Sequence, residues 1–380
     1  TMKESQVITV TLLLSYIVLI IRGEELQNIS QRENTSQGLT NQEINKTIQV
    51  EDGDAYDCID INMQPAFNHP LLKAHKIQLK PSAFPVGMDV EYPFISSISE
   101  ARLPTAECPR GTIPILRNNK QDNTAIQNTS AVSTSQQQEA AGVKYWDDIY
   151  GTQAMINIYE PMVKHQWDLS GSWVQIENGP GRGDAIGAGS WVSPSFSGDN
   201  FARFHISWND EVLNKSCTDH GCPGFMQVSN AVVLGGRIQP VSVYNGRQYG
   251  IQVLIFKDPK TKNWWLVYGE QNIAIGYWPS SQFRYMKEMA SFAMWGGYVQ
   301  GPTATEDSPQ MGSGHFASEG FGRAAFIRDI QIVNENNRRV IPNAVKAHPG
   351  SSSPSKYSYD GYGFNSNGMH VYYGGPGGYS

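Results

Sequence analysis

Trp264-Trp265-Leu266-Val267-Tyr268 is apolar at every position, which is the pattern of a short strand buried on both faces. Other runs are apolar at every second residue, the period of a strand with one buried face; they are Phe204, Ile206 and Trp208, then Ile251, Val253 and Ile255, then Ile273, Ile275 and Tyr277. Turn-forming dipeptides separate the runs, among them Asn178-Gly179, Asn245-Gly246, Asp258-Pro259 and Asp360-Gly361. Many short strands of both kinds predict an all-β fold, an antiparallel β-sandwich.

One short helix is predicted between Ser280 and Met294. Phe283, Met286 and Ala290 are spaced there by three and four residues, the spacing of one helix face.

The composition agrees with this fold class. Of the 380 residues, 39% are hydrophobic, which is enough for a packed core, and only 17% are charged. The 37 Gly and 18 Tyr favour strands and tight turns over long surface helices. Lys and Arg total 29 against 35 Asp and Glu, a formal net charge of −6 without any basic block. This charge pattern excludes a nucleic-acid footprint.

The amino-terminal residues resemble a secretory leader. Lys3 precedes an apolar run over residues 7–21, which is short for a spanning helix and matches the apolar part of a signal peptide. We predict a signal peptide over residues 1–23, with an uncleaved signal anchor as the alternative. Residues 24–50 are rich in Asn, Gln, Ser and Thr and predict a disordered polar tail.

The rest of the chain divides into a smaller and a larger part. A structured segment is predicted over residues 51–117, and a polar linker without hydrophobic periodicity over 118–140. The larger β domain is predicted over 141–380. No membrane span is expected once the signal peptide is removed.

Sequons and cysteines indicate an oxidising compartment. Five Asn-X-Ser/Thr sites support secretion: Asn28, Asn34, Asn45, Asn128 and Asn214. Four cysteines allow three complete pairings: Cys58, Cys108, Cys217 and Cys222. The short spacing of Cys217 and Cys222 favours a local disulfide, which leaves Cys58 with Cys108. The neighbouring His205 and His220 make no recognised zinc pattern, so neither a metal nor another cofactor is predicted.

Two kinds of residue remain as candidates for a site. Asp147 and Asp148 are adjacent acids, but neighbours in a strand point to opposite faces, so we expect two solvated side chains rather than a catalytic pair. Aromatic residues either line a groove for carbohydrate or proline-rich peptide or fill the core of the sandwich; they are Trp264, Trp265, Tyr277, Trp278 and Trp295.

Segments spread along the chain resemble, in order, the neprosin family of plant secreted proteins. They are Asp57-Cys58-Ile59-Asp60, residues 65–72, residues 217–227, Asn263-Trp264-Trp265-Leu266, residues 275–279, Trp295-Gly296-Gly297, residues 310–316 and residues 373–377. The resemblance implies a signal, an activation segment and a β-sandwich related to fungal glutamic peptidases. It also implies cleavage after proline in acid by two glutamates, one of which takes a proton from water while the other polarises the carbonyl or protonates the leaving amine.

Both glutamate positions implied by this resemblance are substituted here. An Ile-Glu-Ala-Gly-Trp segment is matched by Ile186-Gly187-Ala188-Gly189-Ser190, and the glutamate after Trp-Gly-Gly is matched by Tyr298. Glycine does not titrate, and a tyrosine with an ordinary pKa of about 10 is a poor base in acid, although it can donate a hydrogen bond. Loss of a general acid or base costs about 10²–10⁴-fold in rate. Lys356 and Gly378 stand where the resemblance implies cysteines, which removes one disulfide.

We therefore predict a secreted, glycosylated and catalytically inactive homologue of acid glutamic endopeptidases, located in the extracellular fluid, the cell wall or the vacuole. Its predicted partners are proline-rich peptides or cell-wall glycoproteins. The alternative is an active acid prolyl endopeptidase that uses other carboxylates; the candidates are Glu177, Asp184, Glu270 and Glu288.

Overall fold

The computed structural model describes residues 44–50, 53–87, 98–117, 137–365 and 368–378. The predicted signal peptide, the predicted tail up to residue 43 and the sequons at Asn28, Asn34 and Asn128 lie outside these ranges. The chain divides after Ile44, and the elements below belong to Asn45–Ser380 apart from the first residue of β1.

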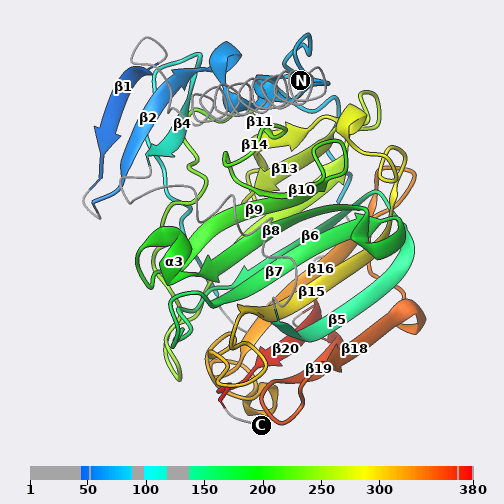
Figure 1. The fold of residues 1–380 in the computed structure, drawn as a ribbon. Helices are drawn as coiled ribbons and strands as arrows, with labels where there is room; N and C mark the ends of the chain where they lie inside the picture. The colour runs from blue at the N-terminus through cyan, green and yellow to red at the C-terminus, as the bar shows by residue number, and fades with distance from the viewer. Residues whose placement is uncertain (1–43, 51–52, 88–97, 118–136, 366–367, 379–380) are drawn as a thin grey trace, which may run out of the picture. The chain divides into compact units, whose positions relative to one another are not determined.

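Two large sheets form the main part of this unit (Figure 1). The first has seven antiparallel strands in the order β10 (Lys215–Thr218), β9 (Arg203–Asp210), β8 (Asp184–Val192), β7 (Leu169–Asn178), β15 (Ala290–Gly301), β5 (Gln137–Ile149) and β18 (Ala347–Ser351). The second has ten strands, eight of them in the order β11 (Met226–Gln227), β14 (Ile273–Trp278), β13 (Trp264–Tyr268), β12 (Tyr249–Lys257), β6 (Gly151–Asn157), β16 (Ala325–Val333), β20 (Gly368–Gly374) and β19 (Ser358–Asn365). Of the remaining two, β17 (Arg339–Val340) pairs with β16, and β3 (Ser99–Glu100) pairs in parallel with β12.

The inward faces of both sheets meet in one hydrophobic core. The seven-stranded sheet contributes Val143, Ile176 and Phe204, and the ten-stranded sheet contributes Ile156, Ile255 and Leu266. The alternating pattern read from the sequence is therefore the core-facing pattern of β9 and β12. The prediction of an antiparallel β-sandwich is confirmed.

Strand β13 is buried on both faces, as its unbroken apolar run predicts. Trp264 and Leu266 belong to the main core. Trp265 and Val267 belong to a second cluster on the other side of the ten-stranded sheet. Residues of the amino-terminal segment, including Ala66, complete that second cluster.

Helical elements among the described residues are short. They are α3 (Pro194–Ser197) and the 3₁₀ turns η1 (Ile61–Met63), η2 (Pro65–Asn68), η3 (Pro180–Arg182), η4 (Ser280–Gln282), η5 (Ala317–Glu319) and η6 (Ala344–Lys346). The predicted helix between Ser280 and Met294 is wrong, because η4 ends at Gln282 and β15 begins at Ala290. Phe283, Met286 and Ala290 are all buried, so their spacing reflects a loop and a strand that pack on the core. In the described part of the chain, no helix is long and apolar enough to cross a membrane.

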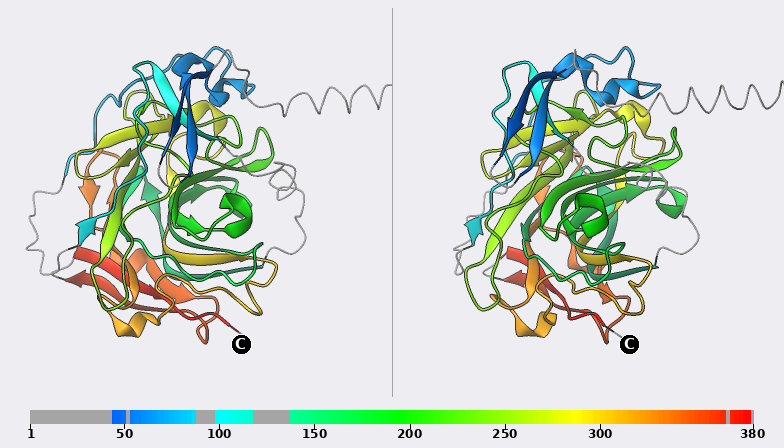
Figure 2. Two further views of the ribbon diagram at one scale, coloured as in Figure 1. Left: turned by 90° about the vertical axis from the view of Figure 1, so that its left-hand side faces the viewer. Right: turned by 60° about the vertical axis from the view of Figure 1, so that its left-hand side comes forward.

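The amino-terminal segment forms a small three-stranded sheet of its own. β1 (Ile44–Gln49) pairs with β2 (Ala55–Asp60), and β2 pairs with β4 (Thr112–Arg117), as the blue and cyan strands of Figure 2 show. β1 begins inside the predicted disordered tail, so that prediction fails for residues 44–49. The strand β5 likewise begins at Gln137, inside the predicted linker.

Both disulfides form in the favoured pairing. Cys58 in β2 is bonded to Cys108, and Cys217 in β10 is bonded to Cys222. All four cysteines of the chain are described and none is free.

Candidate functional site

The two positions at which glutamates were expected lie on one face of the seven-stranded sheet. We call this face, turned away from the main core, the outer face. Gly187 in β8 lies between Ile186 and Ala188, which both belong to the core. Tyr298 in β15 precedes the core residue Val299. Because successive side chains of a strand point to opposite sides, positions 187 and 298 both face outward.

The strand register places the two positions well apart. Gly187 is opposite Gln175 of β7, which is opposite Met294 of β15. Tyr298 is four residues further along β15 and two strands away from Gly187. At about 3.4 Å per residue and about 4.8 Å between strands, the two Cα positions are about 17 Å apart in a flat sheet. The three atoms nearest to the place of a Cβ at residue 187 all belong to Trp173 and none to Tyr298.

Trp173 of β7 occupies the space between them. It is opposite Gly189 on one neighbouring strand and Gly296 on the other, halfway between the levels of Gly187 and Tyr298. A Cβ built on Gly187 would lie 2.7 Å from the indole Cε2 and 2.9 Å from Cζ2. The other side of the ring meets Tyr298 edge-on, with ring centroids 6.0 Å apart and an interplanar angle of 75°.

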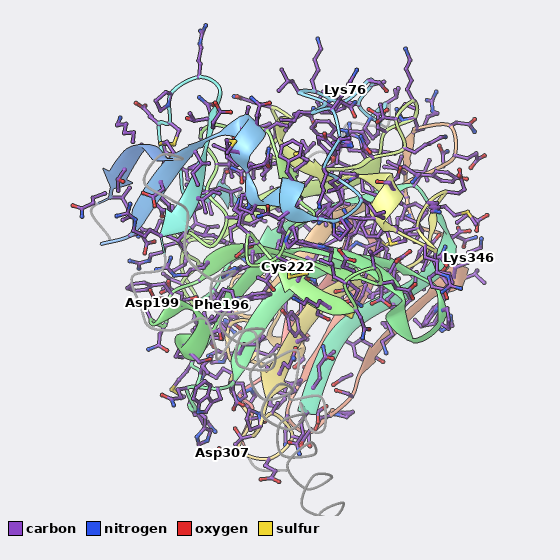
Figure 3. The ribbon with its side chains drawn as sticks, turned by 45° about the horizontal axis from the view of Figure 1, so that its top comes forward. Lys76, Phe196, Asp199, Cys222, Asp307 and Lys346 are labelled. Atoms are coloured by element: carbon purple, nitrogen blue, oxygen red, sulfur yellow. A yellow bond between two sulfur atoms is a disulfide. The ribbon has the colours of Figure 1, made fainter. Side chains whose placement is uncertain are left out.

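Further rings extend Trp173 into a stacked row. Trp191 stacks on Trp173 at a centroid distance of 5.3 Å, and His205 stacks on Trp191 at 4.2 Å. Phe196 of α3, labelled in Figure 3, meets both Trp191 and His205 edge-on. We call Trp173, Trp191, Phe196, His205 and Tyr298 the aromatic cluster.

Four of the five side chains in the aromatic cluster are almost fully buried. Trp173 is 2% exposed, His205 1%, and Trp191 and Tyr298 are each 7% exposed. Burial raises the pKa of the Tyr298 phenol far above its ordinary value. His205 is held by Asp219, with Nδ1 2.6 Å from Oδ2. Tyr298 therefore stays protonated and cannot serve as a base in acid.

A short polar chain runs from the cluster along β7. The Trp173 indole Nε1 donates to Gln175 Oε1 at 3.1 Å, and Gln175 Nε2 donates to Glu177 Oε1. Glu177 is only 8% exposed. This candidate acid thus lies on the outer face, two residues beyond the level of Gly187 and bound to an amide.

The other candidate acids lie elsewhere. Asp184 begins β8 on the core-facing side, is fully buried, and accepts hydrogen bonds from the backbone N–H of Tyr285 and, at 2.8 Å, of Met286. Burial raises its pKa. Glu270 is exposed in the turn between β13 and β14, and Glu288 is exposed in the loop before β15. The four acids therefore come from four separate places and form no pair.

The described residues contain no group of three or more His, Cys, Asp or Glu side chains arranged to hold a metal ion. Asp147 accepts hydrogen bonds from Tyr145 and Lys346, while Asp148 is exposed, so this adjacent pair is two separate solvated acids, as expected.

The predicted aromatic groove is wrong. Its five residues, Trp264, Trp265, Tyr277, Trp278 and Trp295, are all 0% exposed. They fill the core, and the indole N–H groups of Trp264 and Trp295 donate at 2.9 Å to the Met286 carbonyl and the Thr152 hydroxyl.

An exposed aromatic group does exist on the outer face, at another place. Trp146 of β5 is 47% exposed. It meets Phe292 of β15 and His348 of β18 edge-on, each with a centroid distance of 5.1 Å. The strand register places Trp146 level with Phe292 and Glu177. We call Trp146, Phe292 and His348 the exposed ring group.

Sequence reasoning missed both groups of rings. The signals that could have found the aromatic cluster are Gly187 and Gly189, two glycines spaced by two in one strand, where a ring from a neighbouring strand can lie flat on the backbone. The resemblance implies a tryptophan at position 190, where this chain has a serine. The tryptophan of this chain is the next residue, Trp191, which faces outward, whereas Ser190 faces inward.

Two further sequence expectations can be placed. Asn214 is exposed in the turn between β9 and β10, and its side chain is open to modification. Lys356 is buried and donates at 2.5 Å to the Thr305 carbonyl, while Gly378 N–H donates to the Ser308 carbonyl at 3.0 Å. Hydrogen bonds hold the carboxy-terminal residues where a disulfide was implied.

Two family models match the chain. The model described as Neprosin matches residues 166–376, and the model described as Neprosin activation peptide matches residues 47–153.

Several solved structures share part of the fold. Scytalido-glutamic peptidase with a transition state analog inhibitor is 11% identical over 65% of this chain and 100% of its own, with a TM-score of 0.36. SCP-B, a member of the Eqolisin family of peptidases, is 10% identical over the same shares, with a TM-score of 0.33. The Ruminococcus gnavus IT-sialidase CBM40 bound to alpha2,6 sialyllactose is 12% identical over 44% of this chain and 90% of its own, with a TM-score of 0.21. Likeness at this level says nothing about chemistry.

Proposed function

The chain belongs to the neprosin family, and we propose that it is a secreted, catalytically inactive member that binds a ligand on the outer face of its seven-stranded sheet. The observation that carries the loss of catalysis is the place of Trp173, between Gly187 and Tyr298.

Acid hydrolysis by paired carboxyls needs one group that takes a proton from water and another that gives one up. Residue 187 supplies no titratable group. Residue 298 supplies a phenol that is buried against an indole and has a raised pKa. Both halves of the proton transfer are therefore lost together.

The substitutions are also coupled by packing. A glutamate at position 187 would place its Cβ inside contact distance of the Trp173 ring, so the ring would have to move. Restoring a carboxyl there alone therefore disturbs the fold. The aromatic cluster fills the place at which the catalytic glutamates were expected. This packing supports a loss of activity that restoring one glutamate would not reverse.

The exposed ring group is the part of the outer face that suits a ligand. Phe292 and His348 each meet Trp146 edge-on from a neighbouring strand, which fixes the orientation of the indole without covering it. Exposed Lys144 lies in the adjacent row, opposite Met294 and His348. Aromatic side chains on a rigid sheet suit the extended, preformed helix of a proline-rich peptide. We propose such a peptide, as found in wall proteins, as the ligand.

Secretion is supported by the two disulfides, which an oxidising compartment favours.

The binding half of this proposal is tested by titrating a proline-rich peptide into the purified protein and into a Trp146→Ala variant. Loss of the indole is expected to weaken binding about tenfold or more. Trp167→Ala is the matched control, because Trp167 is also exposed, at 56%, but lies outside the seven-stranded sheet. Equal affinity of wild type and Trp146→Ala would contradict the site. Binding of a wall glycan in place of the peptide would contradict the ligand.

A further inference from the structure

We propose that the amino-terminal segment, residues 53–117, stays bound to the sandwich as a separate chain after the polypeptide between Arg117 and Gln137 is cut. The described residues of this segment are 53–87 and 98–117. They contact the sandwich in four ways, and no disulfide links the two parts, because Cys58–Cys108 lies within the segment and Cys217–Cys222 within the sandwich.

The first contact is apolar. Ala66 belongs to the cluster on the far side of the ten-stranded sheet, together with Trp265 and Tyr277, and Phe67 and Ile77 pack against it. The Tyr277 hydroxyl accepts from the Gln78 backbone N–H at 2.9 Å. Departure of the segment would bring a contiguous aromatic face into water, which folded proteins rarely tolerate.

The second contact is the guanidinium of Arg203, which is 4% exposed. Two of its N–H groups donate to Asp54 of the segment, at 2.7 and 3.1 Å. Two donate to Asp199, which Figure 3 labels just after α3, and one donates to the Gly235 carbonyl. All five donors are used, so removal of Asp54 leaves two buried N–H groups without partners.

The third contact is a set of buried polar pairs. Gln64 and Gln227 exchange amide and backbone hydrogen bonds, at 3.2 and 2.8 Å, and both are 0–1% exposed. His69 Nε2 lies 3.0 Å from Asp210 Oδ2, with both side chains fully buried. These pairs fix the position of the segment on the sandwich, because a shifted segment would leave buried polar groups without partners.

The fourth contact extends the sheet itself. β3 adds a short parallel strand to β12, with Ser99 opposite Tyr249 and Glu100 opposite Gly250. The next residue, Ala101, accepts from the Tyr268 hydroxyl at 2.8 Å.

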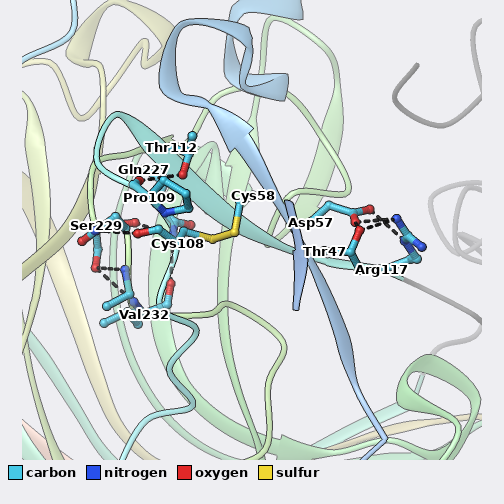
Figure 4. The surroundings of a disulfide bond; sticks show 12 residues. Thr47, Asp57, Cys58, Cys108, Pro109, Thr112, Arg117, Gln227, Ser229 and Val232 are labelled. Atoms are coloured by element: carbon cyan, nitrogen blue, oxygen red, sulfur yellow. Dashed lines mark hydrogen bonds and ion pairs between the residues drawn. A yellow bond between two sulfur atoms is a disulfide. The ribbon is translucent and has the colours of Figure 1, made fainter. Parts of the chain in front are cut away.

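The disulfide makes these contacts cooperative. Cys58 of β2 is bonded to Cys108 (Figure 4). In sequence Cys58 lies between Asp54 and Gln64, and Cys108 follows β3, the strand that pairs with β12. The stretch around Cys58 and the stretch before Cys108 are therefore held close together, and release of one arm leaves the other beside the sandwich. Dissociation of one arm alone does not free the segment, which keeps it in place after the chain is cut.

The experiment replaces residues 118–136 with a sequence cleaved by a site-specific protease and cuts the purified, folded protein. Two bands are expected on a denaturing gel without reducing agent, and one co-eluting peak is expected in size-exclusion chromatography in native buffer at nanomolar concentration. Elution of the segment apart from the sandwich in native buffer would overturn the proposal.

Two variants test whether the contact between Asp54 and Arg203 holds the segment on the sandwich. The cut protein is prepared with a fluorescently labelled segment, and the rate of exchange with unlabelled segment is measured. Asp54→Ala is expected to speed exchange about tenfold or more, because it leaves Arg203 donors unpaired. Asp57→Ala is the control, since Asp57 pairs with Arg117 and with Thr47 of β1, both on the amino-terminal side of the cut, as Figure 4 shows. Equal exchange rates for the two variants would contradict the role given to Arg203.

Discussion

The indole of Trp173 lies against the backbone of Gly187, with Cε2 2.7 Å from the place that a Cβ at residue 187 would take. This relationship ties the two substitutions that remove the glutamates to a change in packing. A ring fills the face on which the chemistry was expected, and Tyr298 closes the other side of that ring.

Gly187→Ala should destabilise the protein by about 1–3 kcal/mol, because the added methyl group meets a ring fixed by its neighbours. Urea unfolding measures the change. Gly350→Ala is the control, since a Cβ on Gly350 meets nothing within 4 Å, and its effect should stay within about 0.5 kcal/mol. An unchanged free energy of unfolding in Gly187→Ala would mean that the Trp173 ring moves freely.

Because of Lys257, the free energy of unfolding should increase as the pH rises above 7. Lys257 is 4% exposed, and burial lowers its pKa to about 7. Below that pH the ammonium is charged in both the folded and the unfolded state, so the full cost of burying it is present. From pH 7 to about 10 the folded state gives up its proton first, and the free energy of unfolding should rise.

The Lys257→Met variant should flatten this dependence and be as stable as wild type, or more so, at pH 6. The gain at pH 6 is limited to about 5 kcal/mol by the pKa shift, less the lost hydrogen bond to the Met286 carbonyl. Unfolding measured at pH 6, 7, 8.5 and 9.5 checks the slope, with exposed Lys144→Met as the control. An unchanged slope in Lys257→Met would contradict the assignment.

Because of Asp329, the free energy of unfolding should be higher in acid than at neutral pH. Burial raises its pKa to about 6, although nearby Arg328 opposes the shift. The folded state then holds the proton more tightly than the unfolded state does, so stability falls as the pH rises from about 4 through 6. Asp329→Asn should be more stable than wild type at pH 7, by up to about 3 kcal/mol, and equal to it at pH 3.5.

Asparagine suits this position, because Asp329 has a φ of 53°, which asparagine tolerates well. Urea unfolding at the two pH values measures the difference, and the exposed Asp360→Asn serves as the control. A loss of stability in Asp329→Asn at pH 7 would show that the carboxylate is favourable in the fold.

The two disulfides should differ in their contribution to stability. Cys58–Cys108 spans 50 residues and Cys217–Cys222 spans 5. The entropy of the unfolded chain predicts losses of about 4 and about 2 kcal/mol when each pair is replaced by alanine. Thermal unfolding of the two double variants measures both, and a larger loss for the shorter loop would contradict the ranking.

The period of hydrophobic residues was enough to predict the sandwich. β13 is buried on both faces, as its sequence indicates, and the alternating apolar residues of β9 and β12 face the main core. The opposite faces of β9 and β12 are buried as well, at His205 and at Leu254 and Phe256, which the alternation did not indicate. The same signal misled at Phe283, Met286 and Ala290, because burial in a loop followed by a strand reproduced a helical spacing.

The site was harder to predict because it depends on which strands are neighbours. Trp173 reaches Gly187 and Tyr298 only because β7 lies between β8 and β15, an order that the sequence does not state. The candidate groove residues are buried for a similar reason. Trp265 and Tyr277 face away from the main core but are covered by a segment about 200 residues earlier in the chain, through Ala66.

Catalytic inactivity is tested by incubating the purified protein, cut between Arg117 and Gln137, with an unstructured proline-rich substrate at acid pH and identifying any fragments by mass spectrometry. We expect an intact substrate, because Gly187 and the buried Tyr298 supply neither base nor acid. Cleavage after proline that disappears in a Glu177→Gln variant would contradict this expectation, and would assign the chemistry to the carboxylate that remains on the outer face.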